Sequence, residues 1–391
     1  MRFLLINQFY PPDAAPTGVF LHDVARGLAA AGHEVGVLCS RRGYDGGGPY
    51  AARETTDGVV VRRLAGVAFG RSGIARAASA LTFMSLVLPR VVARRKPDVV
   101  LTLTSPPYVG LLGALAARLR GVRHVHWAMD VYPDVLRAHG VRAPYAILRG
   151  LARWQMGATR LVIAPAPAMA RRLAGRALPS TTIETVPLWS HEIDHDTDIG
   201  ALRRELGWPE DRLVLLYSGN MGLGHRFDEM LEAARTLGPE GPAWIFAGGG
   251  PRRGELAAAV AVDPHGPLWL LPYASPAEHR SRCLAADVHL LSLRTSWDGL
   301  IVPSKLQAAF GVGRPAILVG SAAGEPGSWI TESGGGWIVA EGDTAGLLRA
   351  VEQAGDATER MRRGRAALAF ARERFSPERN VARMVDLLER A

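Results

Sequence analysis

The chain has 391 residues and a net charge of +9, from 46 Lys and Arg against 37 Asp and Glu. A hydrophobic fraction of 48% and a mean hydropathy of +0.06 exclude a disordered chain, a collagen-like chain and a coiled coil, and the length suits two domains. The basic balance favours anionic partners such as nucleotide phosphates or an acidic membrane surface. The two cysteines lie far apart in apolar segments, which argues against a disulfide framework and favours a reducing, cytoplasmic compartment.

The N-terminal segment resembles a short apolar strand rather than a signal peptide, because no long apolar region or small-residue cleavage site follows it. The longest apolar stretch, Ala77 to Val92, is interrupted by Pro89 and Arg90, so we expect no helix that crosses a bilayer. The surrounding segment 72–96 combines this apolar stretch with several arginines. That composition suits peripheral contact with an anionic membrane, and a core-facing helix with solvated arginines is the alternative.

Short apolar runs alternate with helical patterns through the first half of the chain. The predicted strands cover 3–6, 34–39, 59–63, 98–102, 124–127 and 161–165. The predicted helices cover 19–31, 74–95, 108–120 and 145–156. Several strands are apolar without alternation, as strands buried on both faces are, and the strand–helix order predicts a parallel, doubly wound sheet.

A polar, acidic segment at 186–200 lacks periodicity, and the alternation starts again after it. The later strands are predicted at 213–218, 244–247, 268–271, 288–293 and 315–320. The later helices are predicted at 227–237, 254–262, 276–286 and 304–310, with a last helix beginning at Pro377. We therefore predict an α/β protein with two Rossmann-like domains, 1–188 and 189–375, and expect a ligand between them at the carboxyl ends of the strands.

A glycine-rich block follows the predicted strand 213–218. Its glycines let the backbone approach a ligand, the next helix start offers N–H groups, and a histidine and an arginine add donors, which together predict a site for a diphosphate. An ordinary glycine-rich turn is the alternative. The residues concerned are Gly219, Asn220, Gly222, His225 and Arg226. A second glycine run that includes Gly249 and Gly250 follows the strand 244–247, and a tight turn is the simpler explanation of that run alone.

Lys305 is predicted in the first turn of a helix that Pro303 and Ser304 begin. A cation there opposes the helix dipole, and an anionic ligand would remove the objection. Only two of the 46 basic residues are lysines, Lys96 and Lys305, so this position favours a requirement for a compact charge. A lysine placed there by chance is the alternative.

Two further candidates lie in the first half. Asp130 follows the strand 124–127, where a carboxylate can accept a hydrogen bond or a proton from a substrate hydroxyl, whereas nearby Asp134 is better explained as a helix cap. The long loop 8–18 ends at Thr17 and Gly18, whose N–H groups would face the same cleft, with a rigid surface loop as the alternative. This loop is not GxGxxG, which argues against a nicotinamide oxidoreductase.

Other patterns predict no function. The Asp194–Asp196 pair has the D-x-D spacing of metal-dependent sugar transferases, but it lies in the acidic linker, so we expect no metal there. There is no HExxH or GxSxG motif, and the arginines are not interleaved with aromatic residues, so a zinc protease, a serine hydrolase and a nucleic-acid-binding protein are disfavoured.

Taken together, these motifs resemble the retaining glycosyltransferases of the GT-B fold, family 4, over nearly the whole chain. The subgroup most similar to it assembles cell-envelope polysaccharides on lipid-linked acceptors. The matching segments are 10–18, 32–35, 96–100, 105–107, 130–134, 217–222, 247–250, 302–306 and 313–315.

The resemblance implies transfer of a sugar from a nucleoside-diphosphate sugar, held by the second domain, to a sugar or lipid-linked acceptor held by the first. It implies retention of anomeric configuration, no metal and no other cofactor, and a last helix, 376–391, that returns to the first domain. Without a metal, cations and helix N-termini must stabilise the leaving diphosphate. The catalytic candidates are Asp130, His225, Arg226 and Lys305. The donor-binding candidates are Thr17, Gly18, Gly219, Asn220, Gly222, Gly249, Gly250, Tyr273, Asp298, Pro303, Ser304, Leu306 and Gln307.

The chain also departs from this family. Asn220 and His225 stand where many relatives carry Arg and Lys, and Ala308 stands where a glutamate often binds the ribose. The glutamate that faces the donor sugar has no clear match, although Asp298 is near. Two alternatives therefore stay open: an isomerase such as a nucleotide-sugar 2-epimerase, and a non-catalytic nucleotide-sugar-binding protein. The sequence predicts neither the donor sugar, the base, the acceptor nor the oligomeric state.

Overall fold

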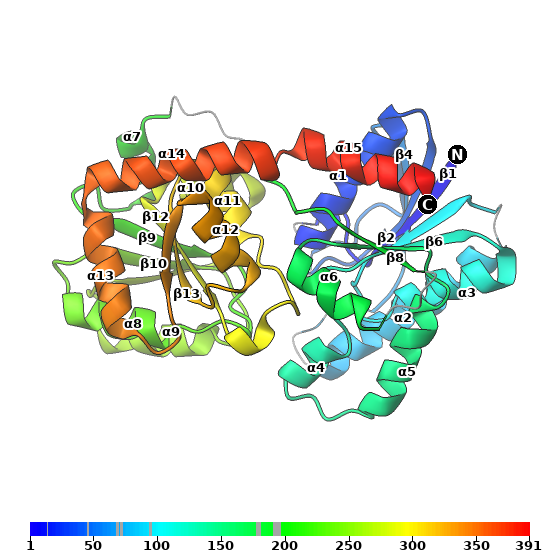
Figure 1. Ribbon diagram of the computed structural model, residues 1–391, viewed down its shortest axis with the longest axis horizontal. Coiled ribbons are helices and arrows are strands. Elements are labelled where there is room, and N and C mark those ends of the chain that lie inside the picture. Colours follow the sequence, from blue (N-terminus) through cyan, green and yellow to red (C-terminus); the bar gives the residue numbers. More distant parts are fainter. Residues whose placement is uncertain are drawn as a thin grey trace. The chain divides into compact units, whose positions relative to one another are not determined.

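The computed structural model describes residues 1–13, 15–44, 47–67, 70, 73–93, 96–176, 181–190 and 197–391 (Figure 1). The chain forms two compact units. One, the N-terminal unit, comprises Met1–Pro187 together with Pro377–Ala391, and the other, the C-terminal unit, comprises Leu188–Ser376. The Asp194–Asp196 pair considered above lies outside the described residues.

The N-terminal unit is built on an eight-stranded sheet with the order β3-β4-β2-β1-β5-β6-β7-β8. All neighbouring strands are parallel except β3 and β4, which are antiparallel. The strands are β1 (Arg2–Ile6), β2 (Glu34–Ser40), β3 (Arg53–Thr56), β4 (Val59–Leu64), β5 (Val99–Thr102), β6 (Arg123–Trp127), β7 (Leu161–Ala164) and β8 (Thr182–Thr185). β5 and β7 are buried along their whole length, because helices cover both faces of the sheet.

Seven helices of the described chain belong to this unit. They are α1 (Pro16–Ala30), α2 (Gly73–Ala93), α3 (Gly110–Arg120), α4 (Asp134–Ala138), α5 (Tyr145–Met156), α6 (Pro167–Ala174) and α15 (Pro377–Arg390). The last helix, α15, packs on α1 at Gly27, where a Cβ atom would lie only 2.7 Å from Val381 Cγ1. His33 on the loop after α1 also lies 2.6 Å from the Glu389 carboxylate. The final segment of the chain is therefore part of the N-terminal unit (Figure 1).

The C-terminal unit has a six-stranded parallel sheet with the order β11-β10-β9-β12-β13-β14. Its strands are β9 (Val214–Ser218), β10 (Ala243–Ala247), β11 (Leu268–Leu271), β12 (Val288–Leu293), β13 (Ala316–Gly320) and β14 (Gly336–Val339). Its helices are α7 (Ile199–Leu206), α8 (Asp228–Leu237), α9 (Arg253–Val262), α10 (Pro276–Ala285), α11 (Lys305–Gly311), α12 (Glu325–Ser333), α13 (Thr344–Gly355) and α14 (Ala357–Arg374), with a short 3-10 turn, η1, at Thr295–Trp297. Aromatic side chains such as Tyr217, Phe227 and Trp244 fill the core on one face.

The predicted fold class is confirmed: each unit is a parallel α/β sheet covered by helices. The expectation about α2 needs correction. Among the described residues one helix, Gly73–Val92, is long and apolar enough to cross a membrane by length and composition alone, with a mean hydropathy of 1.3. Pro89 lies inside this helix and does not end it.

Candidate functional site

Two loops with glycines at special positions lie at the carboxyl ends of β9 and β10. The N–H of Gly219 donates to the Ala247 carbonyl (2.8 Å), and the N–H of Met221 donates to the Gly249 carbonyl (2.6 Å). Gly248 has φ +136, and a Cβ atom there would lie 2.1 Å from the Gly219 carbonyl oxygen. Only glycine allows the two loops to pack this closely. Both loops therefore present backbone atoms at the carboxyl ends of β9 and β10.

Lys305 begins α11 beside these loops. Its Cε atom would lie 3.0 Å from a Cβ atom on Gly219, and its Nζ lies 3.5 Å from His225 Nε2 and 4.9 Å from the centre of the Tyr217 ring. Burial lowers the pKa of Lys305 to about 8. No carboxylate of the described chain pairs with this ammonium group, so its positive charge is held by an uncharged nitrogen and an aromatic face.

His225 is buried, with 4% of its surface exposed, and its hydrogen bonds fix its tautomer. Nδ1 lies 2.5 Å from the Ser292 carbonyl oxygen, which only accepts, so Nδ1 carries the proton. Burial, and then the charge of Lys305, lower the pKa of His225 to about 3, so the ring is neutral and Nε2 is an acceptor facing Lys305. The expectation that His225 gives a donor to a ligand does not fit this geometry; the ring positions Lys305.

Arg226 is also placed differently from the sequence-based expectation. Its guanidinium group binds Glu229 (Nε to Oε1, 2.9 Å) and lies 3.5 Å from Asp228 and 3.9 Å from Glu341. Its charge is therefore already compensated by carboxylates. The expected anion site at the next helix start is likewise wrong, because α8 begins only at Asp228 and carries Asp228 and Glu229 in its own first turn.

The other predicted donor-site residues divide into two groups. Asn220 and Tyr273 lie at the glycine loops: the Tyr273 hydroxyl donates to the Gly249 carbonyl (3.1 Å) and to Asn220 Oδ1 (3.5 Å). The same loops contain Gly222 and Gly250, and a Cβ atom on Gly250 would lie 2.6 Å from Asn220 Oδ1. These positions are therefore brought together with Lys305 at one edge of the C-terminal sheet.

The second group comprises Leu306, Gln307 and Asp298, which pack around the starts of α11 and α12. Leu306 and Gln307 are buried. With the Gln307 amide oriented so that its nitrogen faces the start of α11, that nitrogen donates to the Pro303 and Ser304 carbonyls at 3.3 Å. Asp298 packs against Gly324, the N-cap of α12, where a Cβ atom would lie 2.5 Å from its Oδ1. The side chains of Leu306 and Gln307 are buried in the core, and donor binding at these two positions stays a prediction.

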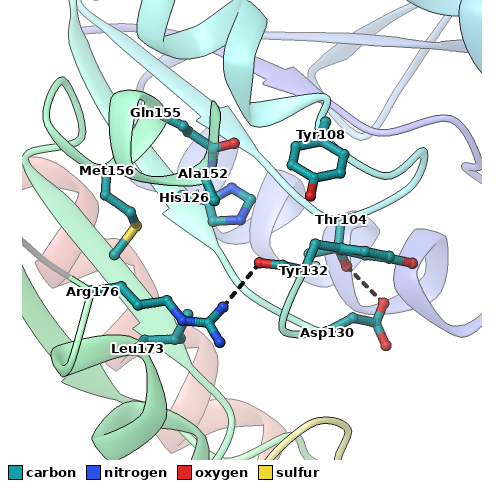
Figure 2. A pocket seen from close by; sticks show the side chains of 10 residues that line it. All are labelled: Thr104, Tyr108, His126, Asp130, Tyr132, Ala152, Gln155, Met156, Leu173 and Arg176. Atoms are coloured by element: carbon teal, nitrogen blue, oxygen red, sulfur yellow. Dashed lines mark hydrogen bonds between the residues drawn. The ribbon is translucent and has the colours of Figure 1, made fainter. Parts of the chain in front are cut away.

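The N-terminal unit has a small pocket of its own, of about 40 Å³, after β6 (Figure 2). Asp130 lies at its edge, and the Thr104 hydroxyl donates to its carboxylate at 3.1 Å. Burial raises the pKa of Asp130 to about 6, although the hydrogen bond from Thr104 lowers it. The pocket is lined by Thr104, Tyr108, His126, Asp130, Tyr132, Ala152, Gln155, Met156, Leu173 and Arg176.

A chain of hydrogen bonds fixes the orientation of His126 in this pocket. The Thr159 hydroxyl donates to the Gln155 carbonyl (2.9 Å), so it accepts from His124 Nδ1 (3.0 Å), and His124 Nε2 accepts from Thr102 (2.9 Å). The Thr102 oxygen then accepts from His126 Nδ1 at 3.0 Å. His126 is therefore the Nδ1–H tautomer, with Nε2 left as an acceptor, and burial lowers its pKa to about 4.

Asp134 forms an ion pair with Arg176. Arg176 Nη1 also donates to the Tyr132 carbonyl at 3.1 Å (Figure 2). The helix cap expected at Asp134 is wrong: Asp134 is the first residue of α4, but the N-cap is Pro133 and no side chain caps this helix, because the Asp134 carboxylate is paired with Arg176. The sequence did not single out His126, Thr104 or Arg176. A signal was present for the histidine: the strand His124–Trp127 carries two polar rings in a run that is otherwise apolar.

Thr17 and Gly18 lie in the first turn of α1, which begins at Pro16. The Asn7 side chain donates to Thr17 Oγ1 at 3.2 Å, and a Cβ atom on Gly18 would lie 2.9 Å from the Phe9 carbonyl oxygen. These contacts fold the loop after β1 onto the helix. Throughout the described ranges, no group of three or more His, Cys, Asp or Glu side chains could hold a metal ion.

Residues 17–189 match the family model described as "Glycosyl transferase 4-like domain". The solved structure of sucrose-phosphate synthase from Thermosynechococcus elongatus superposes with a TM-score of 0.80 at 15% identity, covering 100% of this chain and 98% of that one. The chain thus has a GT-B fold, and residues 17–189 are similar to the glycosyl transferase 4-like domain.

Individual relatives narrow this class. The chain is 26% identical to the putative colanic acid biosynthesis glycosyl transferase WcaI of Escherichia coli (strain K12) over 345 residues, 82% of this chain and 84% of that protein. It is 24% identical to the probable glycosyltransferase WbjE of Pseudomonas aeruginosa, over 66% of each chain. Anabaena HepE, solved in complex with UDP-glucose, is similar with a TM-score of 0.72 at 15% identity and 100% coverage of both chains.

Proposed function

We propose that the chain transfers a hexosyl or N-acetylhexosaminyl group from a nucleoside-diphosphate sugar to a hydroxyl acceptor, with retained anomeric configuration and without a metal ion. The donor binds the C-terminal unit, and Asp130 of the N-terminal unit acts on the acceptor hydroxyl. UDP is the proposed nucleotide, because HepE is solved with UDP-glucose. A lipid-linked acceptor of cell-envelope glycan assembly is proposed from the colanic acid role printed for WcaI.

One observation carries this proposal: the ammonium group of Lys305 has neutral partners. Lys305 is partly buried, and a cation shielded from water without a counter-ion is unfavourable, so an anion that binds beside it removes part of this cost. The adjacent loops present backbone without side chains at Gly219 and Gly248, as a bulky phosphate group requires. The described arginines nearby, Arg226 and Arg252, are already paired with carboxylates.

In the proposed reaction, the bond between the anomeric carbon and the diphosphate oxygen breaks, and the acceptor oxygen bonds to the same carbon. The negative charge that develops on the leaving diphosphate is stabilised by Lys305 and by backbone N–H groups of the glycine loops. Asp130 accepts the hydrogen bond of the acceptor hydroxyl and orients it, and the carboxylate takes its proton as the bond forms. The negative charge of the leaving diphosphate is thereby stabilised by groups of the protein itself, Lys305 and the backbone N–H groups.

Ligand-induced stabilisation tests the donor half of this proposal. UDP, GDP and dTDP are added separately to the full chain with a chelator present, and the melting temperature is followed. A nucleoside diphosphate at about 100 times its Kd stabilises the folded state by roughly 2.7 kcal/mol, so one of the three, expected to be UDP, raises the melting temperature by a few degrees. A shift that requires added manganese contradicts the metal-independent proposal.

Product analysis tests the transfer itself. The chain is incubated with the stabilising nucleotide sugar, with and without an acceptor extract, and nucleoside diphosphate release is measured. Acceptor-dependent release supports transfer. An epimerised nucleotide sugar in the absence of acceptor identifies an isomerase, and binding without release under all conditions identifies a non-catalytic protein.

A further inference from the structure

The outer faces of α2, α3 and α5 expose large apolar side chains. These helices lie side by side on one side of the N-terminal sheet, with α3 contacting both neighbours, whereas α1 and α15 pack together on the other side (Figure 1). We call the exposed residues the apolar outer surface. They are Ile74, Leu81, Leu88 and Val92 on α2, Leu119 on α3, and Ile147, Leu151 and Trp154 on α5.

The spacing of these residues forms one apolar stripe along α2 and another along α5, with Leu119 as the single exposed apolar residue of α3. On α2 they recur at intervals of seven, seven and four residues from Ile74, and on α5 at four and three from Ile147, so each set shares one helix face. Ile74 is 85% exposed and Leu81 is 68% exposed. Contiguous apolar side chains on this scale mark an interaction site in a folded protein.

The opposite face of α2 is already used. Phe83, Val87 and Val91 are buried in one core cluster with sheet residues such as Ile6 and Val100. From Phe83 to Val91 the helix is therefore packed in this core, and its exposed apolar residues lie on another face. This geometry fits a helix lying in the plane of a membrane surface and does not fit a helix that leaves the unit to cross a bilayer.

The three helices also carry only one sign of charge. None contains Asp or Glu, and each has arginines near its C-terminal end. Arg118 lies 4.2 Å above the Trp154 ring and donates to the Trp154 carbonyl at 3.1 Å, and Arg120 donates to the Val91 carbonyl at 2.9 Å. These contacts link the ends of the three helices, where arginine and tryptophan meet as they do at membrane interfaces.

The net charge is distributed unevenly between residues 58–183, which include these three helices, and the rest of the chain. Residues 58–183 contain 19 Lys and Arg but only three acidic residues, a net charge of +16, so the rest of the chain carries −7 of the overall +9. Three of these basic residues, Arg71, Arg94 and Arg95, lie outside the described residues. A basic, apolar surface is complementary to an anionic lipid surface, whereas a second copy of the same surface would repel it.

We infer that the apolar outer surface of α2, α3 and α5 docks the protein on an anionic lipid bilayer, with both helices α2 and α5 lying in the interface. The inference extends the membrane contact expected for segment 72–96 to a second helix, and it does not depend on the proposed sugar transfer. The exposed apolar side chains enter the acyl boundary, and the arginines remain at the level of the anionic headgroups.

Vesicle flotation of the full chain tests this inference. The wild-type chain floats with vesicles of phosphatidylcholine and phosphatidylglycerol and is released by high salt, because the arginine contribution is screened. The variant Ile74→Ser/Leu81→Ser/Ile147→Ser/Leu151→Ser binds these vesicles at least about 100-fold more weakly. The variant Arg149→Gln/Arg153→Gln binds about fivefold more weakly per arginine removed.

Matched controls separate docking from misfolding. Val262→Ser and Met361→Ser remove exposed apolar side chains from the C-terminal unit and leave vesicle binding unchanged. The quadruple variant keeps its melting temperature and its rate with a water-soluble acceptor. Four results would each overturn the inference. Two concern vesicle binding: equal binding to pure phosphatidylcholine, and unweakened binding by the quadruple variant. The other two are resistance of the bound protein to alkaline extraction, and a wild-type dimer that the quadruple variant abolishes.

Discussion

The pocket at Asp130 and the site at Lys305 each place one ionisable group among neutral partners, a carboxyl group in the first and an ammonium group in the second. Each holds one ionisable group against neutral partners: a threonine hydroxyl for Asp130, and a histidine ring for Lys305. Burial raises the pKa of the carboxyl to about 6 and lowers the pKa of the ammonium to about 8. Because its partner is neutral, the Asp130 carboxylate is available to accept a proton, and for the same reason the Lys305 ammonium is available to bind an anion. The arginines near Lys305 differ, because they are already paired with carboxylates.

Substitution of the carboxylate is expected to have the largest effect. Asp130→Asn keeps the shape of the pocket but removes the group that takes the acceptor proton, so turnover falls by about 10³-fold. Nucleoside diphosphate affinity, measured by calorimetry, stays within about threefold because the donor loops are in the other unit. A variant with an unchanged rate would remove Asp130 from the mechanism.

Lys305→Ala is expected to lower turnover by roughly 10²-fold, the scale for losing one preorganised charge donor. Steady-state kinetics with saturating donor measure this loss. Lys305→Arg serves as the matched control, because it keeps the charge but spreads it over a planar group, and it restores only part of the rate. A full rate in the alanine variant would show that the diphosphate is stabilised elsewhere.

The two shifted pKa values predict a bell-shaped pH profile. Asp130 acts when ionised, so kcat/KM rises with pH up to about 6, and Lys305 acts when protonated, so kcat/KM falls above about 8. Beyond each limit the rate changes about tenfold per pH unit. His225→Gln moves the alkaline limb to lower pH, because a weaker acceptor faces the ammonium group; an unmoved limb would assign that limb to another residue.

Arg226→Gln should have the smallest effect on function. Its guanidinium group is already compensated by Glu229, which is 2% exposed, so nucleoside diphosphate affinity stays within about threefold. Stability falls by about 3 kcal/mol, because a buried carboxylate loses its partner. Thermal denaturation and calorimetry on the same preparation give both numbers, and a large loss of affinity at unchanged stability would reverse the assignment.

The alternation of apolar runs and helical patterns predicted every strand except β3, β8 and β14, because parallel strands such as β5 and β7 are apolar along their whole length. The edge strand β3 (Arg53–Thr56) was missed because it contains no apolar side chain and most of its residues are exposed. Sequence reasoning also selected Lys305 as a candidate because lysine is rare in this arginine-rich chain, and the structure places it beside the glycine loops, while its role stays a prediction.

The roles of individual side chains were harder to predict than their location. His225 and Arg226 follow the glycine loop as two apparent donors, but their partners, Ser292 and Glu229, are set by tertiary packing. The same holds for His126, whose tautomer depends on Thr102, Thr159 and Gln155 together. Hydrogen bonds between residues far apart in the sequence leave no trace in local spacing.

The return of α15 to the N-terminal unit has a consequence for synthesis of the protein. The C-terminal unit is inserted within the N-terminal one, so 189 residues separate Pro187 from the helix that completes its unit. At about 5–20 residues per second, the ribosome needs roughly 10–40 s to make that insert. During this interval α1 of the nascent chain lacks its packing partner at Gly27, because Val381 has not yet been synthesised. The N-terminal unit is therefore the first to begin folding and the last to be completed.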